Sequence, residues 1–221
     1  IELTIEEIGP APVPFCWLGF GSQGRKEQLL NADQDNGLLI SNKLEEQDKA
    51  WFEVLAKRVC DGLNECGYVY CPGNVMATND KWRQPLSAWQ ATVDKWTVSP
   101  TPNAVMHTSI FFDLRAIYGE HSLCTDLQSH MLNKASSNSI FLAALAQNVL
   151  SSEPPMGIFR RFVVEHNGEH ADELDLKKRA ILPIIYLVRL HSLAHSITEV
   201  NTIDRLNALV KCKAMTIEDS R

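Results

Sequence analysis

Two aspartates, Asp33 and Asp35, lie one residue apart where a polar loop leads into an apolar run. Side chains at positions i and i+2 of a strand project from the same face, so both carboxylates would point to one side. Like charges held this close repel each other unless a cation shares them. Because magnesium prefers oxygen ligands, the pair predicts a divalent metal site. A solvated acidic turn is the alternative.

The segments around this pair have the pattern of short strands joined by a loop. The apolar run 15–20 ends at Gly21 and indicates a buried strand, and 36–40 indicates a second one. Apolar and polar residues alternate over 109–119, which predicts a later strand carrying Asp113. The three aspartates would then lie on neighbouring strands of one sheet, with their carboxylates converging.

Helical spacing of apolar residues dominates much of the remaining chain. It predicts an amphipathic helix between Glu45 and Cys66, and a mainly helical region after about residue 120. The other expected segments are a loop with at most one helical turn over 71–86, and helices at 123–132, 140–150, 182–197 and 201–210. This order predicts an α+β fold with two domains, a mixed-sheet domain over 1–135 and a helical bundle over 136–221.

Composition excludes several classes of protein. The chain has 221 residues, 45% of them hydrophobic and 22% charged, which is the balance of a globular protein. Its formal net charge of -6 argues against a broad nucleic-acid interface, and no apolar run approaches the roughly 18 residues of a membrane span. The six cysteines form no C-x-x-C pair and the N-terminus lacks signal-peptide order, so we expect reduced thiols and a cytoplasmic location.

Four segments together resemble a known family: GSQGRKEQLLNADQDN, CPGNVMATNDKWRQPLSAW, SIFFDLR and GEHADELDLKKRAILPI. The chain is similar to nucleotidyltransferases of bacterial signalling proteins that carry CBS and cyclic-nucleotide-binding domains, and to the protein-PII uridylyltransferase catalytic domain. The resemblance covers nearly the whole chain. It implies a polymerase-beta-like nucleotidyltransferase domain followed by a helical substrate-binding domain. One departure is that Gln34 and Asn36 flank Asp35 where many relatives have apolar residues, so we expect this strand to be less buried.

The resemblance also implies roles for individual residues. Asp33, Asp35 and Asp113 would be the catalytic carboxylates that hold two Mg²⁺ ions, with Mn²⁺ as the alternative. Gly21 and Ser22 would bind the triphosphate, the glycine by allowing close backbone approach and the serine through its hydroxyl. Three basic residues are further candidates for nucleotide binding: Arg25, Arg83 and Lys177. A structural ion pair is the alternative for Arg83, and a solvated helix start is the alternative for Lys177.

The implied reaction is transfer of a nucleoside monophosphate from a nucleoside triphosphate to an acceptor, with release of pyrophosphate. The acceptor, a protein or a small molecule, is not identified by the sequence. We expect the nucleotide to lie in the cleft between the two domains. A second hypothesis is a catalytically silent nucleotide sensor within a signalling protein.

The last residues, TIEDSR, have the pattern of a helix start with Thr216 as N-cap and Asp219 as its acidic partner. We therefore expect the natural chain to continue beyond Arg221. A missing helix would leave an apolar stripe exposed along 182–197 or 201–210, and such a stripe would favour a homodimer.

Overall fold

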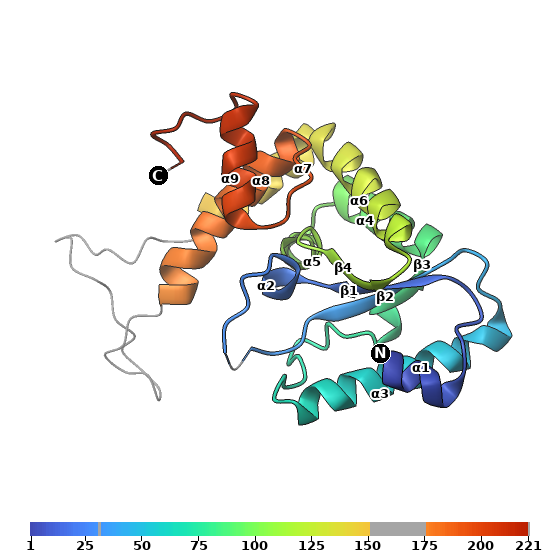
Figure 1. The fold of residues 1–221 in the computed structure, drawn as a ribbon. Helices are drawn as coiled ribbons and strands as arrows, with labels where there is room; N and C mark the ends of the chain where they lie inside the picture. The colour runs from blue at the N-terminus through green and yellow to red at the C-terminus, as the bar shows by residue number, and fades with distance from the viewer. Residues whose placement is uncertain (31, 151–175, 221) are drawn as a thin grey trace. The chain divides into compact units, whose positions relative to one another are not determined.

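The computed structural model describes residues 1–30, 32–150 and 176–220 (Figure 1). Contacts divide the chain into two compact units, residues 1–134 and 135–221. The elements that begin in the first unit are α1 (Glu2–Ile8), β1 (Phe15–Gly19), α2 (Gly21–Gly24), β2 (Asn36–Ile40), η1 (Glu46–Asp48), α3 (Lys49–Glu65), η2 (Asp80–Trp82), β3 (Arg83–Pro85), α4 (Leu86–Val98), α5 (Pro102–Phe111), β4 (Arg115–Gly119) and α6 (His121–Ser136). Those of the second unit are α7 (Ser139–Leu150), the π-helical turn η3 (Lys177–Ile181), α8 (Leu182–Ala194) and α9 (Thr202–Lys211).

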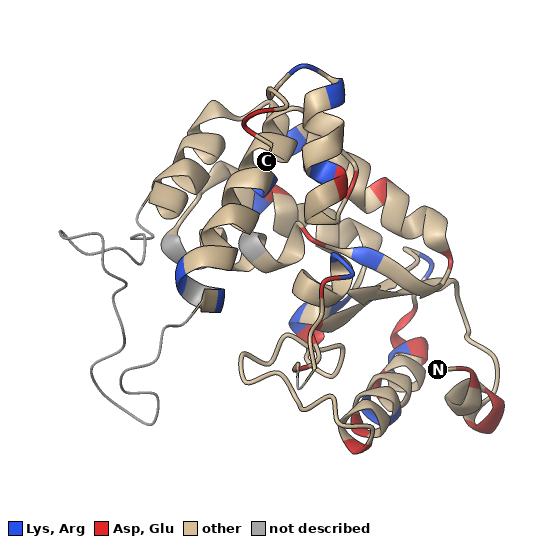
Figure 2. Ribbon diagram, turned by 60° about the vertical axis from the view of Figure 1, so that its left-hand side comes forward, with Lys and Arg blue, Asp and Glu red and all other residues tan. Residues whose placement is uncertain are grey.

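The described residues of the first unit form a four-stranded mixed sheet in the order β3-β2-β1-β4. β1 is antiparallel to both β2 and β4, whereas β2 and β3 are parallel. Every residue of β1 and β2 is buried, and neither strand contains a charged residue (Figure 2). The predicted α+β fold, with a mixed sheet followed by helices, is confirmed.

Helices cover both faces of this sheet: α1 and α3 lie on one side, and α4 and α6 lie on the other (Figure 1). On the α3 side, the Phe15 ring packs edge-on against Phe52, with ring centroids 5.7 Å apart. On the other side, Trp89 of α4 stacks on Phe111 of α5 at 4.7 Å, and its Nε1 donates a 3.1 Å hydrogen bond to the Leu38 carbonyl. The two central strands are thus fixed by aromatic packing from both sides.

The prediction of a strand over 109–119 is wrong for the first half of this range. Helix α5 occupies the chain as far as Phe111, a turn follows, and β4 begins only at Arg115. A helix forms here because the Thr101 side chain accepts a hydrogen bond from the Ala104 amide and Pro102 occupies the first helical turn. Phe111 is buried in the aromatic cluster, so the apolar alternation reflected tertiary packing rather than a strand. Strand β3 and helix α4 are not predicted by the sequence pattern.

The second unit contains helices close to the predicted ranges. Asn201 begins α9 by accepting hydrogen bonds from two backbone amides, and Pro183 lies in the first turn of α8, as expected. Ile184 and Leu187 of α8 are 57% and 45% exposed, so this helix presents apolar side chains on its surface. None of the described helices is long and apolar enough to cross a membrane. The segment GEHADELDLKKRAILPI begins at residue 168, and its first part, residues 168–175, lies outside the described residues.

Candidate metal and nucleotide site

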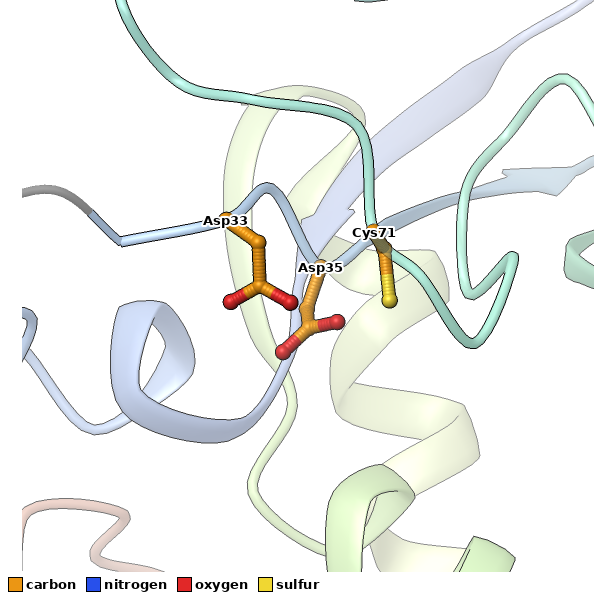
Figure 3. A group of neighbouring side chains, drawn as sticks. All are labelled: Asp33, Asp35 and Cys71. Atoms are coloured by element: carbon orange, nitrogen blue, oxygen red, sulfur yellow. The ribbon is translucent and has the colours of Figure 1, made fainter. Parts of the chain in front are cut away.

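Three side chains converge just before strand β2: the carboxylates of Asp33 and Asp35 and the thiol of Cys71 (Figure 3). One ligand atom from each lies within 4.8 Å of the other two. Both aspartates are half-buried, whereas Cys71 is buried. In the part of the chain that the structure describes, this is the group of metal-ligating side chains close enough to share one ion. Sequence reasoning identified both aspartates but missed Cys71.

The two aspartates face one side because the residues that alternate with them face the α3 side. Gln34 is 3% exposed, and its Nε2 donates 3.0 Å hydrogen bonds to the carbonyls of Cys60 and Tyr68. Asn36 is 1% exposed. The expectation that these polar residues would leave the strand less buried is therefore wrong. The amide groups are tolerated in the interior because they are hydrogen-bonded there.

Asn36 connects three segments through its buried side chain. Its Nδ2 donates to Gln34 Oε1 at 3.1 Å, and its Oδ1 accepts from the Ala77 amide at 2.9 Å and from Cys60 Sγ at 3.5 Å. A buried neutral network of this kind fixes the backbone without bringing a charge near the carboxylates. Strand β2, helix α3 and the loop before η2 are held together behind the site.

The loop that carries Cys71 is attached to the same backbone segment at two points. The Gln34 amide donates to the Val69 carbonyl at 3.0 Å, and the Asn36 amide donates to the Val75 carbonyl at 3.1 Å. Cys71 lies between these two attachments. Burial raises the pKa of the Cys71 thiol to about 11, and its hydrogen bond to the Asp35 carboxylate acts in the same direction. In the metal-free protein this sulfur therefore carries its proton at neutral pH.

The Gly21-Ser22 turn lies against Asp35. The Phe20 amide donates to the Asp35 carbonyl at 3.0 Å, which holds the start of α2 beside this residue. Gly21 has φ +53°, and a Cβ built there would lie 3.4 Å from Asp35 Oδ2. Glycine suits this position because most other residues avoid such a φ. Ser22 follows on the same turn and is half-buried. The structure thus brings Gly21, Asp33 and Asp35 together.

Asp113 lies elsewhere, in the turn between α5 and β4, and does not belong to the group of Asp33, Asp35 and Cys71. Its Oδ2 is 2.6 Å from Arg25 Nη1, and the Arg25 Nε is 2.7 Å from Glu27 Oε2. Asp113 is fully buried and Arg25 is 6% exposed. Burial opposes the charge on Arg25, but Asp113 and Glu27 raise the pKa of its guanidinium. Two residues expected at the metal and nucleotide therefore pair with each other.

This ion pair is part of a tight contact between α2 and the segment before β4. A Cβ built on Gly24 would collide with the Asp113 carbonyl oxygen, so the backbones approach closely here. Arg115 donates from Nε to the Gly24 carbonyl at 3.1 Å and from Nη2 to the Gln23 carbonyl at 3.0 Å. The hydrogen bonds from Arg115 to α2 were not predicted from the sequence, although Arg115 lies only two residues after Asp113.

The two other predicted basic residues lie in different surroundings. The Arg83 guanidinium donates to the carbonyls of Ala77 and Thr78 at 2.8 and 3.1 Å, and it also pairs with Asp80 and with Glu53. This arrangement favours the structural alternative for Arg83, which fixes the loop after Cys71. Lys177 belongs to the second unit, where it is exposed in the π-helical turn. Its binding to a triphosphate stays a prediction.

Comparison with known families covers most of the chain. Residues 1–103 match the family described as Putative nucleotidyltransferase DUF294. Residues 139–221 match the family described as Putative nucleotidyltransferase substrate binding domain. The first match includes Gly21, both aspartates of the group and Cys71, whereas Asp113 lies beyond it. The sequence matches none of the curated proteins with which it was compared.

Proposed function

Because the chain belongs to the family described as Putative nucleotidyltransferase DUF294, with its substrate-binding domain, we propose that it transfers a nucleoside monophosphate from a nucleoside triphosphate to a hydroxyl or other acceptor group. The observation that carries this proposal is the convergence of the Asp33 and Asp35 carboxylates beside the Gly21 turn. With a hydroxyl acceptor, the acceptor oxygen bonds to the α-phosphorus while the bond to the leaving pyrophosphate breaks, and the hydroxyl proton passes to solvent. Family membership supports the reaction class, and the carboxylate pair supports where it takes place.

The donor set fits a divalent cation. Two half-buried carboxylates whose oxygens lie within 4.8 Å of each other suit Mg²⁺ or Mn²⁺, both of which prefer oxygen ligands. Asp33 and Asp35 would hold the cation, which when bound would neutralise phosphate charge and activate the attacking oxygen. Asp113 enters this proposal as the partner of Arg25 rather than as a ligand.

The remaining roles belong to positioning by the chain itself. Gly21 lets the backbone approach a phosphate group, and the Ser22 hydroxyl would donate to a phosphate oxygen. The Arg25–Asp113 pair and the Arg115 hydrogen bonds would fix the position of α2, and with it the position of Gly21 and Ser22. Fixed geometry of this kind accounts for much of the rate in phosphoryl transfer.

A second candidate function is nucleotide binding without turnover, as a sensor within a signalling protein. The observation that favours it is the pairing of Asp113 with Arg25, which leaves two carboxylates rather than three in the group. Incubation with each of the four labelled triphosphates, magnesium and a cell extract separates the two candidates. A labelled product supports the transferase, whereas binding without any product supports the sensor. The free thiols of all six cysteines fit a cytoplasmic setting for either function.

Thermal melts of wild type and Asp35→Asn, with and without magnesium plus a non-hydrolysable triphosphate, test the site directly. Without ligands we expect the variant to be as stable as wild type or slightly more stable, because repulsion from Asp33 is removed. The asparagine oxygen can still accept a hydrogen bond from Cys71. With ligands at about 100 times their Kd, wild type should gain about 2.7 kcal/mol, and the variant should lose most of this gain.

The matched control is Asp126→Asn, which changes an exposed aspartate on α6. This variant should keep the full gain from magnesium and the triphosphate. If Asp35→Asn gains as much from the ligands as wild type does, Asp35 does not hold the cation and the proposed site is wrong.

A further inference from the structure

The thiol of Cys71 distinguishes this group from a site made of oxygen ligands alone. Its sulfur lies within 4.8 Å of an oxygen of both Asp33 and Asp35, and the three side chains project side by side in the same direction (Figure 3). Magnesium gains nothing from a sulfur ligand, because it is a hard cation that takes oxygen. A thiolate instead favours softer cations, such as zinc and cadmium.

The position of the sulfur is fixed by the fold. The attachments at Val69 and Val75 hold the loop on either side of Cys71 to the segment that carries the aspartates. Within the loop, the Asn74 amide donates to the Cys71 carbonyl at 2.9 Å, which closes a turn with Asn74 at φ +53°. The sulfur and the two carboxylates are therefore prearranged on parts of one hydrogen-bonded backbone unit.

A second observation points to a ligand at this place. The Gly21 turn lies against Asp35 Oδ2, and both aspartates fall within the match to the family described as Putative nucleotidyltransferase DUF294. The group therefore belongs to a region expected to receive metal and phosphate.

We propose that the Asp33–Asp35–Cys71 group binds a thiophilic divalent cation, zinc in the first instance, and that this cation competes with magnesium at the proposed active site. The cation would take one sulfur and carboxylate oxygens from the protein and complete a four-coordinate shell with water. Its binding replaces the thiol proton, which is released to solvent. Zinc would then inhibit the transferase by occupying the carboxylates that magnesium needs. This inference rests on the proposed function for its inhibitory effect, but the metal site can be tested without activity.

The test uses cadmium as a spectroscopic probe, because cadmium bound to a thiolate gives an ultraviolet charge-transfer absorption that magnesium cannot give. Cys66 and Cys212 are exposed and would also bind cadmium, so both are first changed to serine in the full chain. We expect this background protein to titrate to one equivalent of sulfur-bound cadmium. Adding Cys71→Ser should abolish the absorption, and zinc added before cadmium should suppress it.

A carboxylate variant provides a second measurement. Asp35→Asn in the background protein keeps Cys71 but removes one oxygen ligand, so the cadmium absorption should require a higher metal concentration. Because Asp35 is half-buried, this variant is expected to fold even if Cys71→Ser does not. A cadmium titration identical in the background protein and in Asp35→Asn would overturn the shared site.

Thermal melts with magnesium and a non-hydrolysable triphosphate separate this inference from the proposed function. Cys71→Ser should keep the magnesium-dependent gain in stability and should resist its loss on addition of zinc. If zinc removes the gain equally in both proteins, or if the cadmium absorption persists without Cys71, the inference is wrong while the proposed function stands. If no protein gains stability from magnesium and triphosphate, but the cadmium absorption still depends on Cys71, the proposed function is wrong and the metal site remains.

Discussion

The acidic residues near the two ends of α2 differ in their burial and in their surroundings. Asp113 is fully buried and its oxygen is 2.6 Å from the Arg25 guanidinium, so its charge is balanced within the fold. Asp33 and Asp35 are half-buried, and their carboxylates converge with each other and with the Cys71 thiol. A buried carboxylate depends on its partner, because loss of the partner leaves an uncompensated charge, whereas a converging, partly open pair of carboxylates is suited to an external cation. The same residue type therefore serves two different purposes within one small region.

The frames that hold the two regions also differ. The carboxylate group is backed by neutral amides, since Gln34 and Asn36 satisfy one another and the surrounding backbone. The Asp113 region is held by ions and by close backbone contact at Gly24. One region is therefore supported by neutral hydrogen bonds, and the other by an ion pair and close backbone packing. Substitutions in each set of supporting contacts test this difference.

The largest effect on stability is expected from Arg25→Met, which removes the guanidinium group that pairs with Asp113. Breaking a buried ion pair leaves an uncompensated charge, and this typically costs about 3–5 kcal/mol. Chemical denaturation of the metal-free protein should therefore show a strong loss of unfolding free energy. The matched control Lys49→Met breaks an exposed pair with Glu46 and should change stability by at most about 0.5 kcal/mol. Equal effects of the two variants would contradict a special role for the buried pair.

Gly24→Ala tests the close backbone contact, with an expected loss of about 3 kcal/mol. The added methyl group overlaps the Asp113 carbonyl, and backbone cannot move aside as a flexible side chain can. Gly62→Ala is the matched control, because a Cβ there meets nothing within 4 Å in the interior of α3. That control should raise stability by about 0.5–1 kcal/mol, as measured by denaturant unfolding. A tolerated Gly24→Ala would mean that α2 is not clamped against Asp113.

The smallest of these losses, about 2 kcal/mol, is expected from Asn36→Leu in the neutral frame. Leucine has a similar size, but it leaves the Ala77 amide and Gln34 Oε1 without their hydrogen bonds to Asn36. Because the loop that carries Cys71 loses a support, cadmium binding to the Cys71 thiolate should also weaken, by about 10- to 100-fold. Arg25→Met measured in the same titration should weaken it less. If Asn36→Leu lowers stability but leaves the cadmium titration unchanged, the amide network does not position the thiol.

Part of this arrangement could be predicted because its signals are local. The apolar run 36–40 became β2 with those bounds, and the alternation of two strand faces placed Asp33 and Asp35 on one side. The wrong prediction of a strand around Asp113 has a specific cause. Its apolar neighbours alternate as in a strand, but Thr101 and Pro102 start a helix whose end reaches Phe111. Local alternation cannot reveal that an aromatic cluster, rather than a sheet, buries these residues.

By itself, the sequence determined the α+β order of elements, the aspartate pair with the glycine turn before it, and the family to which they belong. These follow from periodicity and from residues close together in the chain. Only the tertiary structure decided which distant residues lie beside the carboxylates. Arg25 pairs with Asp113, 88 positions away, and the Cys71 thiol lies close to Asp33 and Asp35. The physical reason is that electrostatic interactions depend on distance in space and on burial, and neither is set by separation along the chain.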